Sequence, residues 1–288
     1  MSTQTSKIDI NFIGCGRVGK TLAKLFIKSK VAKIVGVVTS SLASAARTCK
    51  WIGEGQAFSS LQNLPSAKIY FITTKDSDIE NMCVQLNRIK LPAGAIVVHC
   101  SGMLSSSILK TIKQKNIYRA SIHPLKSFSD PSEVRFNNTF CAFEGDAKAY
   151  RVINKLFAAI GGTVFKISAK EKTNYHLASV IANNFTTILH ELATSYFEKS
   201  NIPKSIAKQM VSTLMQDVIN NVAHLPHEKV LTGPLQRGDV AVLKAHLQKI
   251  KNPKHKKLYA LFSYLGLDLT THPVKKKKKI KTILSKAS

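Results

Sequence analysis

The chain has 288 residues, 44% of them hydrophobic, so it can bury the core of one large domain or of two ordinary ones. Its net charge of +27 is compatible with a nucleic-acid or membrane partner, but the lysines are scattered, aromatic residues are few and no nucleic-acid motif accompanies them. Five scattered cysteines exclude a disulfide framework, and no metal-binding spacing, signal peptide or apolar membrane span is present. We therefore expect a soluble cytoplasmic protein with no metal, no membrane association and no specific nucleic-acid partner.

Short apolar runs alternate with helix-like segments from residue 8 to about residue 167. The runs predict strands at Ile8–Gly14, Lys33–Val38, Lys68–Thr73, Ala95–Cys100, Tyr118–Ile122, Thr139–Glu144 and Thr163–Lys166. Helices are expected at Val18–Ser29, roughly Ser77–Asn87, Leu104–Lys113 and Ala147–Ile160. Ser77 followed by Glu80 is a capping-box signature. This alternation predicts an α/β fold with a parallel, doubly wound sheet, whose edge the later hairpin-like strands can extend.

Only helical patterns follow residue 168. The segment 169–200 is typical of a single long amphipathic helix, and further helices are expected in the remainder. We predict a nucleotide-binding domain over residues 1–167 and an all-helical domain over residues 168–273. Residues 274–288 form a lysine-rich tail that we expect to be disordered, because like charges repel and little there can be buried.

A glycine motif, GCGRVG, joins the first predicted strand to the first predicted helix. This context is typical of a dinucleotide fingerprint: Gly14 permits a tight turn, Gly16 lets the backbone approach a diphosphate, and Gly19 lets helix and strand pack closely. The helix N-terminus adds unpaired N–H groups and a positive dipole end. The alternative is a glycine-rich turn with a purely structural role. The cofactor-binding residues predicted here are Gly14, Cys15, Gly16, Arg17, Val18 and Gly19.

The end of the second predicted strand indicates which nucleotide is bound. NAD sites usually carry Asp or Glu at this position, whereas here Val38 is followed by Thr39, Ser40 and Ser41. Hydroxyl groups tolerate the 2′-phosphate of NADP, and Arg47 can pair with it. We therefore favour NADP over NAD as the cofactor. The alternative is that these hydroxyls only cap a helix.

The carboxyl ends of the later strands complete the predicted crevice, because ligands of open α/β sheets bind at that edge. The polar residues that leave these ends are Thr73, Thr74, Lys75, His99, Cys100, Ser101, Gly102, His123 and Pro124. Among them Thr73, Thr74, Lys75, Ser101 and Gly102 are predicted cofactor contacts, and Pro124 is a predicted substrate contact.

Histidine and asparagine recur along the long predicted helix. His176, Asn183 and His190 are spaced by seven residues, so a regular helix places them on one stripe. We expect His176 and Asn183 to line a cleft between the domains and His190 to face solvent. Asn184 falls on the apolar face and there needs a buried partner. Farther on, Arg237 can clamp an anionic group or pair with Asp239.

Four segments, FIGCGRVGKTLA, IHPLKSF, YHLASVIANNF and LTGPLQRGDV, carry a family resemblance. The chain resembles Rossmann-like NAD(P)-binding proteins whose C-terminal half is a helical domain of unknown function. These are relatives of pyrroline-5-carboxylate reductase, ketopantoate reductase and the 6-phosphogluconate dehydrogenase superfamily. The resemblance implies a dehydrogenase with a helical domain that tends to dimerise. The β-hydroxyacid dehydrogenases of that superfamily place Lys and Asn one turn apart. Here Lys172 precedes His176 instead, so the lysine role is not expected to carry over.

The functional hypothesis is an NADP-dependent oxidoreductase that moves a hydride between the nicotinamide and a small, anionic carbonyl, hydroxyl or imine substrate. His176 or His123 exchanges the proton, Asn183 and Asn184 orient the substrate, and Arg237 or Lys126 holds its anionic group. One alternative is a non-catalytic NAD(P)-binding sensor or scaffold, since a fold does not guarantee chemistry. Another is nucleic-acid binding driven by charge alone.

Overall fold

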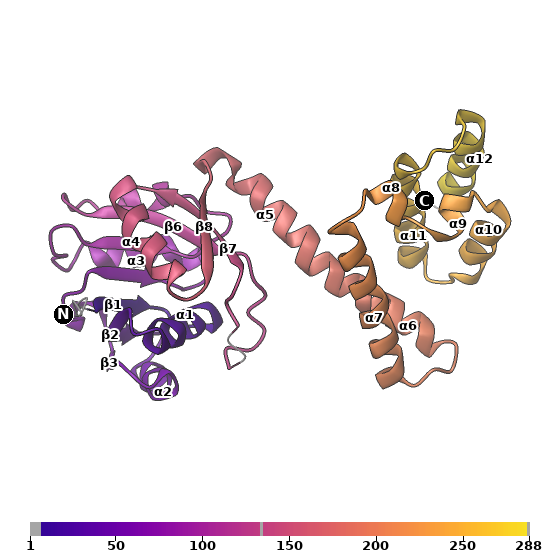
Figure 1. Cartoon of the computed structure of the whole chain (residues 1–288). Helices are drawn as coiled ribbons and strands as arrows, with labels where there is room; N and C mark the ends of the chain where they lie inside the picture. Colours follow the sequence, from indigo (N-terminus) through magenta and orange to yellow (C-terminus); the bar gives the residue numbers. More distant parts are fainter. Residues whose placement is uncertain (1–6, 133–134, 287–288) are drawn as a thin grey trace, which may run out of the picture. The chain divides into compact units, whose positions relative to one another are not determined.

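The structure is a computed structural model that describes residues 7–132 and 135–286. Packing divides the chain into an N-terminal unit, Met1–Thr186, and a helical unit, Thr187–Ser288 (Figure 1). The division therefore falls later than residue 167, the boundary expected from the sequence. The reason is that the first turns of the long helix pack on the sheet through side chains such as Lys172. In the described part of the chain, no helix is long and apolar enough to cross a membrane.

An eight-stranded sheet of order β3-β2-β1-β4-β5-β6-β7-β8 forms the N-terminal unit. Every strand pair is parallel except β6 and β7, which are antiparallel. The predicted doubly wound α/β fold is thus confirmed, and each expected strand is present. The short edge strand β3 was not predicted. The strands are β1 (Ile8–Ile13), β2 (Ala32–Val38), β3 (Gln56–Phe58), β4 (Ile69–Ile72), β5 (Ile96–His99), β6 (Tyr118–Pro124), β7 (Thr139–Gly145) and β8 (Gly162–Lys166).

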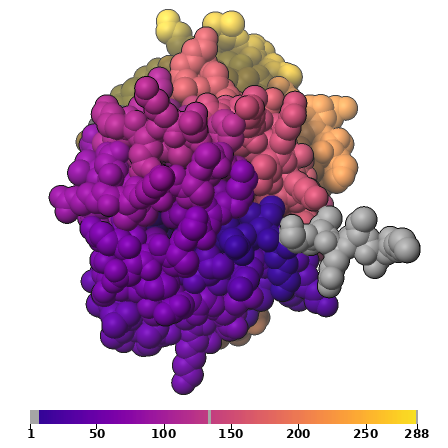
Figure 2. All heavy atoms as spheres, turned by 90° about the vertical axis from the view of Figure 1, so that its left-hand side faces the viewer, coloured from indigo at the N-terminus to yellow at the C-terminus, as the bar shows by residue number. Residues whose placement is uncertain are grey.

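The sheet is buried on both faces, because the side chains of its central strands alternate between the two sides and are apolar on each. Phe12 and Phe71 stack with ring centroids 5.3 Å apart in the core on one face. Their neighbours Ile13 and Ile72 belong to the core on the other face. The helices of this unit are α1 (Arg17–Lys28), α2 (Leu42–Ile52), α3 (Ile79–Leu86), α4 (Ala147–Ala158) and α5 (Lys172–Val180). Figure 2 shows one surface of the unit, with its first strands and helices in indigo and purple.

Three helical expectations need correction. Helix α2 was not predicted, although Ser41 caps it by accepting a hydrogen bond from the Ser44 N–H. The capping box at Ser77 does not form, because a 3₁₀ turn precedes α3 and the Ser77 hydroxyl donates to Asp78 instead. The segment predicted as a helix after β5 is a 3₁₀ helix, Ser106–Thr111.

A π-helical turn, Ile181–Phe185, interrupts the long helix that was predicted to be regular. It follows α5 and precedes α6 (Thr186–Glu198). A π turn accommodates one residue more than an α turn, so positions beyond it are rotated by about 100° from those that a regular helix gives. The expected stripe at intervals of seven therefore does not continue from His176 to His190.

The helical unit contains a small core formed by residues such as Leu243, Leu247, Ala260 and Leu267. Its remaining helices are α7 (Lys204–Val222), α8 (His227–Val230), α9 (Gly233–Arg237), α10 (Val240–Lys249), α11 (Pro253–Gly266) and α12 (Val274–Ser285).

Helix α12 corrects the expectation of a disordered tail. Ile280 and Leu284 are fully buried in the core of the helical unit. They lie four residues apart and so share one face of the helix, whereas the five consecutive lysines before Ile280 are exposed or half-buried. Residues 287 and 288 lie outside the described residues.

Candidate functional site

The glycine motif forms the tight turn between β1 and α1. Gly14 has φ +68°, a conformation that favours glycine, and its N–H donates to Val38 O over 2.7 Å. A Cβ added to Gly14 would lie 2.4 Å from Cγ2 of Thr74. The Thr73 hydroxyl donates to the Gly14 carbonyl oxygen. The loop after β4 thus holds the glycine turn in place.

Gly16 and Gly19 have contrasting surroundings. A Cβ on Gly16 would meet no described atom within 4 Å, whereas a Cβ on Gly19 would lie 2.4 Å from the Thr73 hydroxyl oxygen. Gly19 therefore allows close packing, and Gly16 leaves open space at the N-terminus of α1. In the described residues no side chain caps that end of the 12-residue helix, and no acidic residue lies in its first turn. The first N–H groups of the helix can therefore receive an anion.

The chemistry of the surrounding side chains also fits a diphosphate. Cys15 is buried, which raises the pKa of its thiol to about 12, so it adds no negative charge near the turn. The Thr74 hydroxyl oxygen is buried and has no hydrogen-bond partner among the described residues. Arg17 is exposed and Val18 is half-buried at the start of α1, and Lys75 is exposed after β4. The residues present therefore fit the phosphate groups of a dinucleotide.

The end of β2 shows one of the two roles considered for it, the capping of a helix. The Thr39 hydroxyl donates to Ser41 O over 3.0 Å, and the Ser41 hydroxyl caps α2. Ser40 and Arg47 have exposed side chains. The capping interpretation is thus correct for Ser41, while Ser40 and Arg47 can still contact a ligand.

Ser101 is fixed at the end of β5 by several hydrogen bonds. Its N–H donates to Nδ1 of His99 over 3.2 Å, and its hydroxyl donates to Asp76 over 2.6 Å. The other ring nitrogen of His99 lies 3.2 Å from Ser105 O. Burial lowers the pKa of His99 to about 4. His99 is therefore a neutral structural residue, and the Ser101 hydroxyl is used within the loop.

Gly102 packs against two imidazole rings. A Cβ here would lie 2.7 Å from Cδ2 of His176 and 3.0 Å from Nε2 of His123. The two ring centroids are 6.3 Å apart, and Nδ1 of His123 lies 3.0 Å from the Tyr175 hydroxyl. Burial, followed by the charges of Lys172 and His176, lowers the pKa of His123 to about 4. The loop after β5, the end of β6 and α5 thus bring two histidines together.

A cavity of about 480 Å³ opens beside this histidine pair. Five residues that the sequence placed in a site line this cavity: His123, Lys126, His176, Asn183 and Asn184. None of the described lining residues is acidic. Its full lining is His123, Leu125, Lys126, Ser127, Tyr175, His176, Ala178, Ser179, Val180, Ala182, Asn183 and Asn184.

Two predicted substrate contacts are placed differently from the expectation. Pro124 is buried and is not among the residues that line the cavity. Asn184 is exposed rather than buried, and its side-chain oxygen accepts a hydrogen bond from the Asn183 amide over 3.2 Å. The apolar face that was expected to bury Asn184 is itself exposed, with Leu177 and Ile181 each at least half accessible.

Lys172 is the residue of this region that sequence reasoning set aside. It is 1% exposed, and its Nζ donates to Ser101 O over 3.0 Å and to the Ser121 hydroxyl over 2.6 Å. Burial lowers the pKa of Lys172 to about 8. Its position one turn before His176, on the same helix face, was the sequence feature that could have indicated a place near the site.

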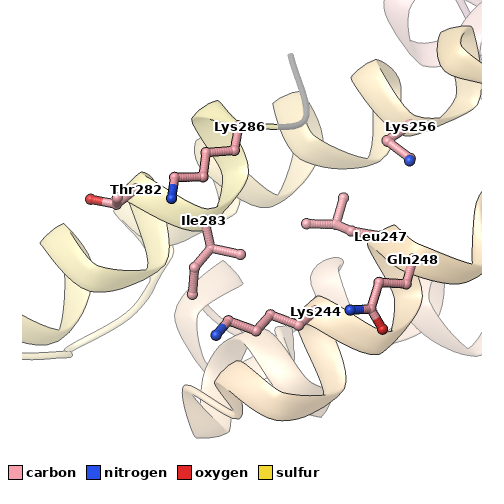
Figure 3. Close-up of a pocket in the computed structure, with 7 residues that line it drawn as sticks. All are labelled: Lys244, Leu247, Gln248, Lys256, Thr282, Ile283 and Lys286. Atoms are coloured by element: carbon pink, nitrogen blue, oxygen red, sulfur yellow. The ribbon is translucent and has the colours of Figure 1, made fainter.

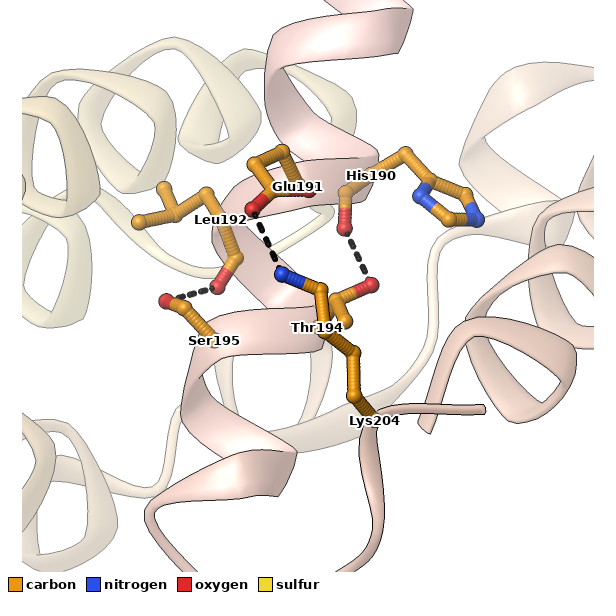
Figure 4. Close-up of polar contacts among 6 residues, drawn as sticks. All are labelled: His190, Glu191, Leu192, Thr194, Ser195 and Lys204. Atoms are coloured by element: carbon orange, nitrogen blue, oxygen red, sulfur yellow. Dashed lines mark hydrogen bonds and ion pairs between the residues drawn. The ribbon is translucent and has the colours of Figure 1, made fainter. Parts of the chain in front are cut away.

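His190 and Arg237 belong to the helical unit. His190 lies 3.0 Å from the Ser212 hydroxyl through Nε2, and its carbonyl accepts a hydrogen bond from Thr194 close to the Glu191–Lys204 ion pair (Figure 4). Arg237 is exposed. Within the described residues it forms no ion pair with Asp239, which caps α10 through the Val242 N–H.

A separate hollow of about 340 Å³ lies among α10, α11 and α12 (Figure 3). Its rim carries Lys244, Lys256 and Lys286, with Leu247 and Ile283 between them. None of the residues predicted for a site lies there. Across the described residues, no three His, Cys, Asp or Glu side chains are grouped as a metal ion would require.

Two family models match the chain in succession. Residues 1–124 match a Rossmann-like domain, and residues 139–265 match a domain of unknown function, DUF2520. No curated protein matches the sequence significantly.

Solved structures share the fold. A Bacteroides fragilis protein, provisionally named an NADP oxidoreductase, has a TM-score of 0.76 and 23% identity over 91% of this chain and 98% of its own. A Thermotoga maritima protein has a TM-score of 0.66 and 27% identity over 95% and 98%. The Plasmodium falciparum pyrroline carboxylate reductase with NADP bound has a TM-score of 0.63 and 13% identity over 96% and 98%.

Proposed function

We propose that this chain, a Rossmann-like domain followed by a DUF2520 domain, is an NADP-dependent oxidoreductase acting on a small anionic carbonyl, hydroxyl or imine compound. One arrangement carries the proposal. The open turn at Gly16 follows β1, and the paired imidazoles of His123 and His176 stand beside Gly102, which follows β5. Because β1, β4, β5 and β6 are parallel, their carboxyl ends share the sheet edge at which such folds bind ligands.

The cofactor would be held mainly by the main chain of the glycine turn and the N-terminus of α1. The loop after β4 would contribute Thr73, Thr74 and Lys75. NADP is favoured over NAD because the end of β2 carries hydroxyls, with Arg47 nearby in sequence, and no carboxylate in its described residues. Fold neighbours include both a reductase with NADP bound and a prephenate dehydrogenase with NAD+ bound, so the choice rests on these side chains.

A bound nicotinamide supplies or accepts the hydride. In the reducing direction, as the C=O or C=N carbon of the substrate is reduced, a histidine would donate a proton to the oxygen or nitrogen of that group. An alcohol or amine and oxidised nucleotide result. Asn183 would orient the substrate, and Lys126 would attract its anionic group, because the cavity lining described above contains no carboxylate to oppose it. The role of Arg237 stays a prediction.

Incubation of the protein with NADPH and a panel of small keto acids, cyclic imines and lactones tests the proposal. We expect loss of reduced-nicotinamide absorbance with at least one class. Calorimetry should give tighter binding of NADPH than of NADH. His176→Ala should abolish turnover and leave NADPH affinity nearly unchanged. Tighter NADH binding would contradict the cofactor assignment, and full activity of the variant would remove His176 from the reaction.

One observation favours a second candidate, a nucleotide-binding sensor. Neither histidine is oriented by a carboxylate among the described lining residues, unlike many acid–base pairs. Binding of NADPH without its oxidation across the whole panel would support the sensor and contradict the enzyme.

A further inference from the structure

One buried residue contacts the backbone that holds the histidine pair without lining the cavity itself. Lys172 donates to the Ser101 carbonyl oxygen and the Ser121 hydroxyl. Ser101 directly precedes Gly102, against which both imidazole rings pack. The lysine therefore ties α5 to the ends of β5 and β6 at the residue next to the contact surface of the two histidines.

The same helical turn carries the other parts of the arrangement. Tyr175 and His176 follow Lys172 by three and four residues, so all three share one face of α5. The Tyr175 hydroxyl contacts Nδ1 of His123 at 3.0 Å. Anchoring Lys172 in the sheet consequently fixes both the tyrosine that holds His123 and the second histidine.

Burial opposes the protonation of His123 most strongly, and the charges around it act mainly in the same direction. Lys172 and His176 oppose its protonation, whereas Asp76 favours it more weakly. Tyr175 is neutral because burial raises its pKa to about 12. Around Lys172, Glu144 and Asp76 favour the charged ammonium, and burial raises the pKa of the nearby Cys100 thiol, which stays uncharged.

We propose that Lys172 is a positioning residue that gives the two histidines different roles. It fixes the Ser101–Gly102 backbone, and its positive charge reinforces the burial that keeps His123 a neutral imidazole bonded to Tyr175, which leaves proton exchange to His176. Lys172 itself does not touch the substrate. The assignment of proton exchange rests on the proposed function, but the state of His123 is a property of the free protein. In many enzymes the environment keeps one of two neighbouring titratable groups neutral, so that only the other exchanges protons.

Nitrogen NMR of the imidazole rings in the full-length chain tests the inference. His123 and His176 are assigned with the variants His123→Gln and His176→Gln. In the unaltered protein, His123 should stay neutral down to about pH 5. In Lys172→Met, which keeps a long side chain but removes the charge, its midpoint should rise by up to about one pH unit, because the burial of the ring remains. Lys170→Met, which removes an exposed lysine nearby, should leave the midpoint unchanged.

Protonation of His123 at an ordinary midpoint in the unaltered protein would overturn the inference, even if Lys172→Met failed to fold. An unchanged midpoint in a folded Lys172→Met variant would overturn it as well. Once a substrate is known, His123→Gln should keep the pH profile of kcat with a lower maximum, and His176→Gln should lose the profile. If no substrate is turned over, the proposed function fails while the NMR result stands.

Discussion

A substitution at Gly16 should change the affinity for NADPH without changing the free energy of unfolding. Because a Cβ there meets no described atom within 4 Å, Gly16→Ala should change the free energy of unfolding by less than about 0.5 kcal/mol. The added methyl group should nevertheless obstruct a diphosphate and weaken NADPH binding by about tenfold, or ~1.4 kcal/mol. Calorimetric titration and urea denaturation measure the two effects. Unchanged NADPH affinity would argue against a phosphate site at this turn.

Gly14→Ala serves as the matched comparison. The positive φ and the close approach of Thr74 should make this variant less stable by on the order of 1–3 kcal/mol.

Lys172 should give the stability of the protein an unusual dependence on pH. Burial lowers its pKa to about 8 in the fold, from the ordinary lysine value of 10.5. Between these values the unfolded chain binds a proton that the folded chain lacks, so the free energy of unfolding rises with pH. Below pH 8 both states are protonated, and the cost of burying the charge is present in full.

Relative to Lys172→Met, the unaltered protein should gain about 2 kcal/mol between roughly pH 7.5 and pH 9.5. Urea denaturation of both proteins at the two pH values measures this gain. A constant difference between them would show that the lysine titrates normally in the fold.

The residues of the site were predictable where a local pattern sets their conformation. The turn around Gly14 follows from adjacent residues, and the place of His123 at the carboxyl edge of the sheet follows from the rule that parallel strand ends meet there. His176 lies on α5, so its approach to His123 depends on how that helix packs. The bond from Lys172 to Ser101 was not predictable, because it joins residues 71 positions apart and depends on how deeply α5 packs on the sheet. The exposure of Asn184 was missed for a related reason, since the apolar residues beside it are exposed too.

At the scale of elements, the lysine-rich composition of α12 led to a prediction of disorder where the structure has a helix. Five consecutive lysines dominate the segment, yet Ile280 and Leu284 provide a buried face. The short strand β3 and helix α2 were missed because three residues, or a mixed sequence rich in Ala and Ser, give weak periodicity. The central strands were predictable because long apolar runs in a two-sided sheet leave little ambiguity.

Helix α12 should contribute measurably to the stability of the helical unit. Ile280→Ala should lower the free energy of unfolding by about 2–5 kcal/mol, because it opens a cavity in a small core. Val274→Ala is the control, since Val274 is 83% exposed and its truncation should cost less than about 0.5 kcal/mol. Denaturation followed by circular dichroism measures both. Equal stability of the two variants would show that α12 is dispensable.

At the scale of the whole molecule, an apolar stripe on α7 favours a homodimer formed through the helical unit. Ile206, Met210, Leu214 and Val218 recur every four residues and are 49%, 39%, 61% and 46% exposed. Such a stripe is costly to leave in water. We expect light scattering to give twice the chain mass of 31.7 kDa, and Leu214→Glu to halve it. A single chain mass for the unaltered protein would contradict the dimer.

The π-helical turn at Ile181–Phe185 has a consequence for sequence length. The π turn contains one residue more than an α turn. A relative with one residue fewer here would therefore have a continuous α-helix, and its two flanking helices would keep their present orientation about the helix axis. Such a deletion would remove the widened loop of backbone that sets two neighbouring amides, Asn183 and Asn184, into the cavity wall. We therefore expect relatives that are shorter by one residue here to keep both flanking helices and to lack this placement of the two amides.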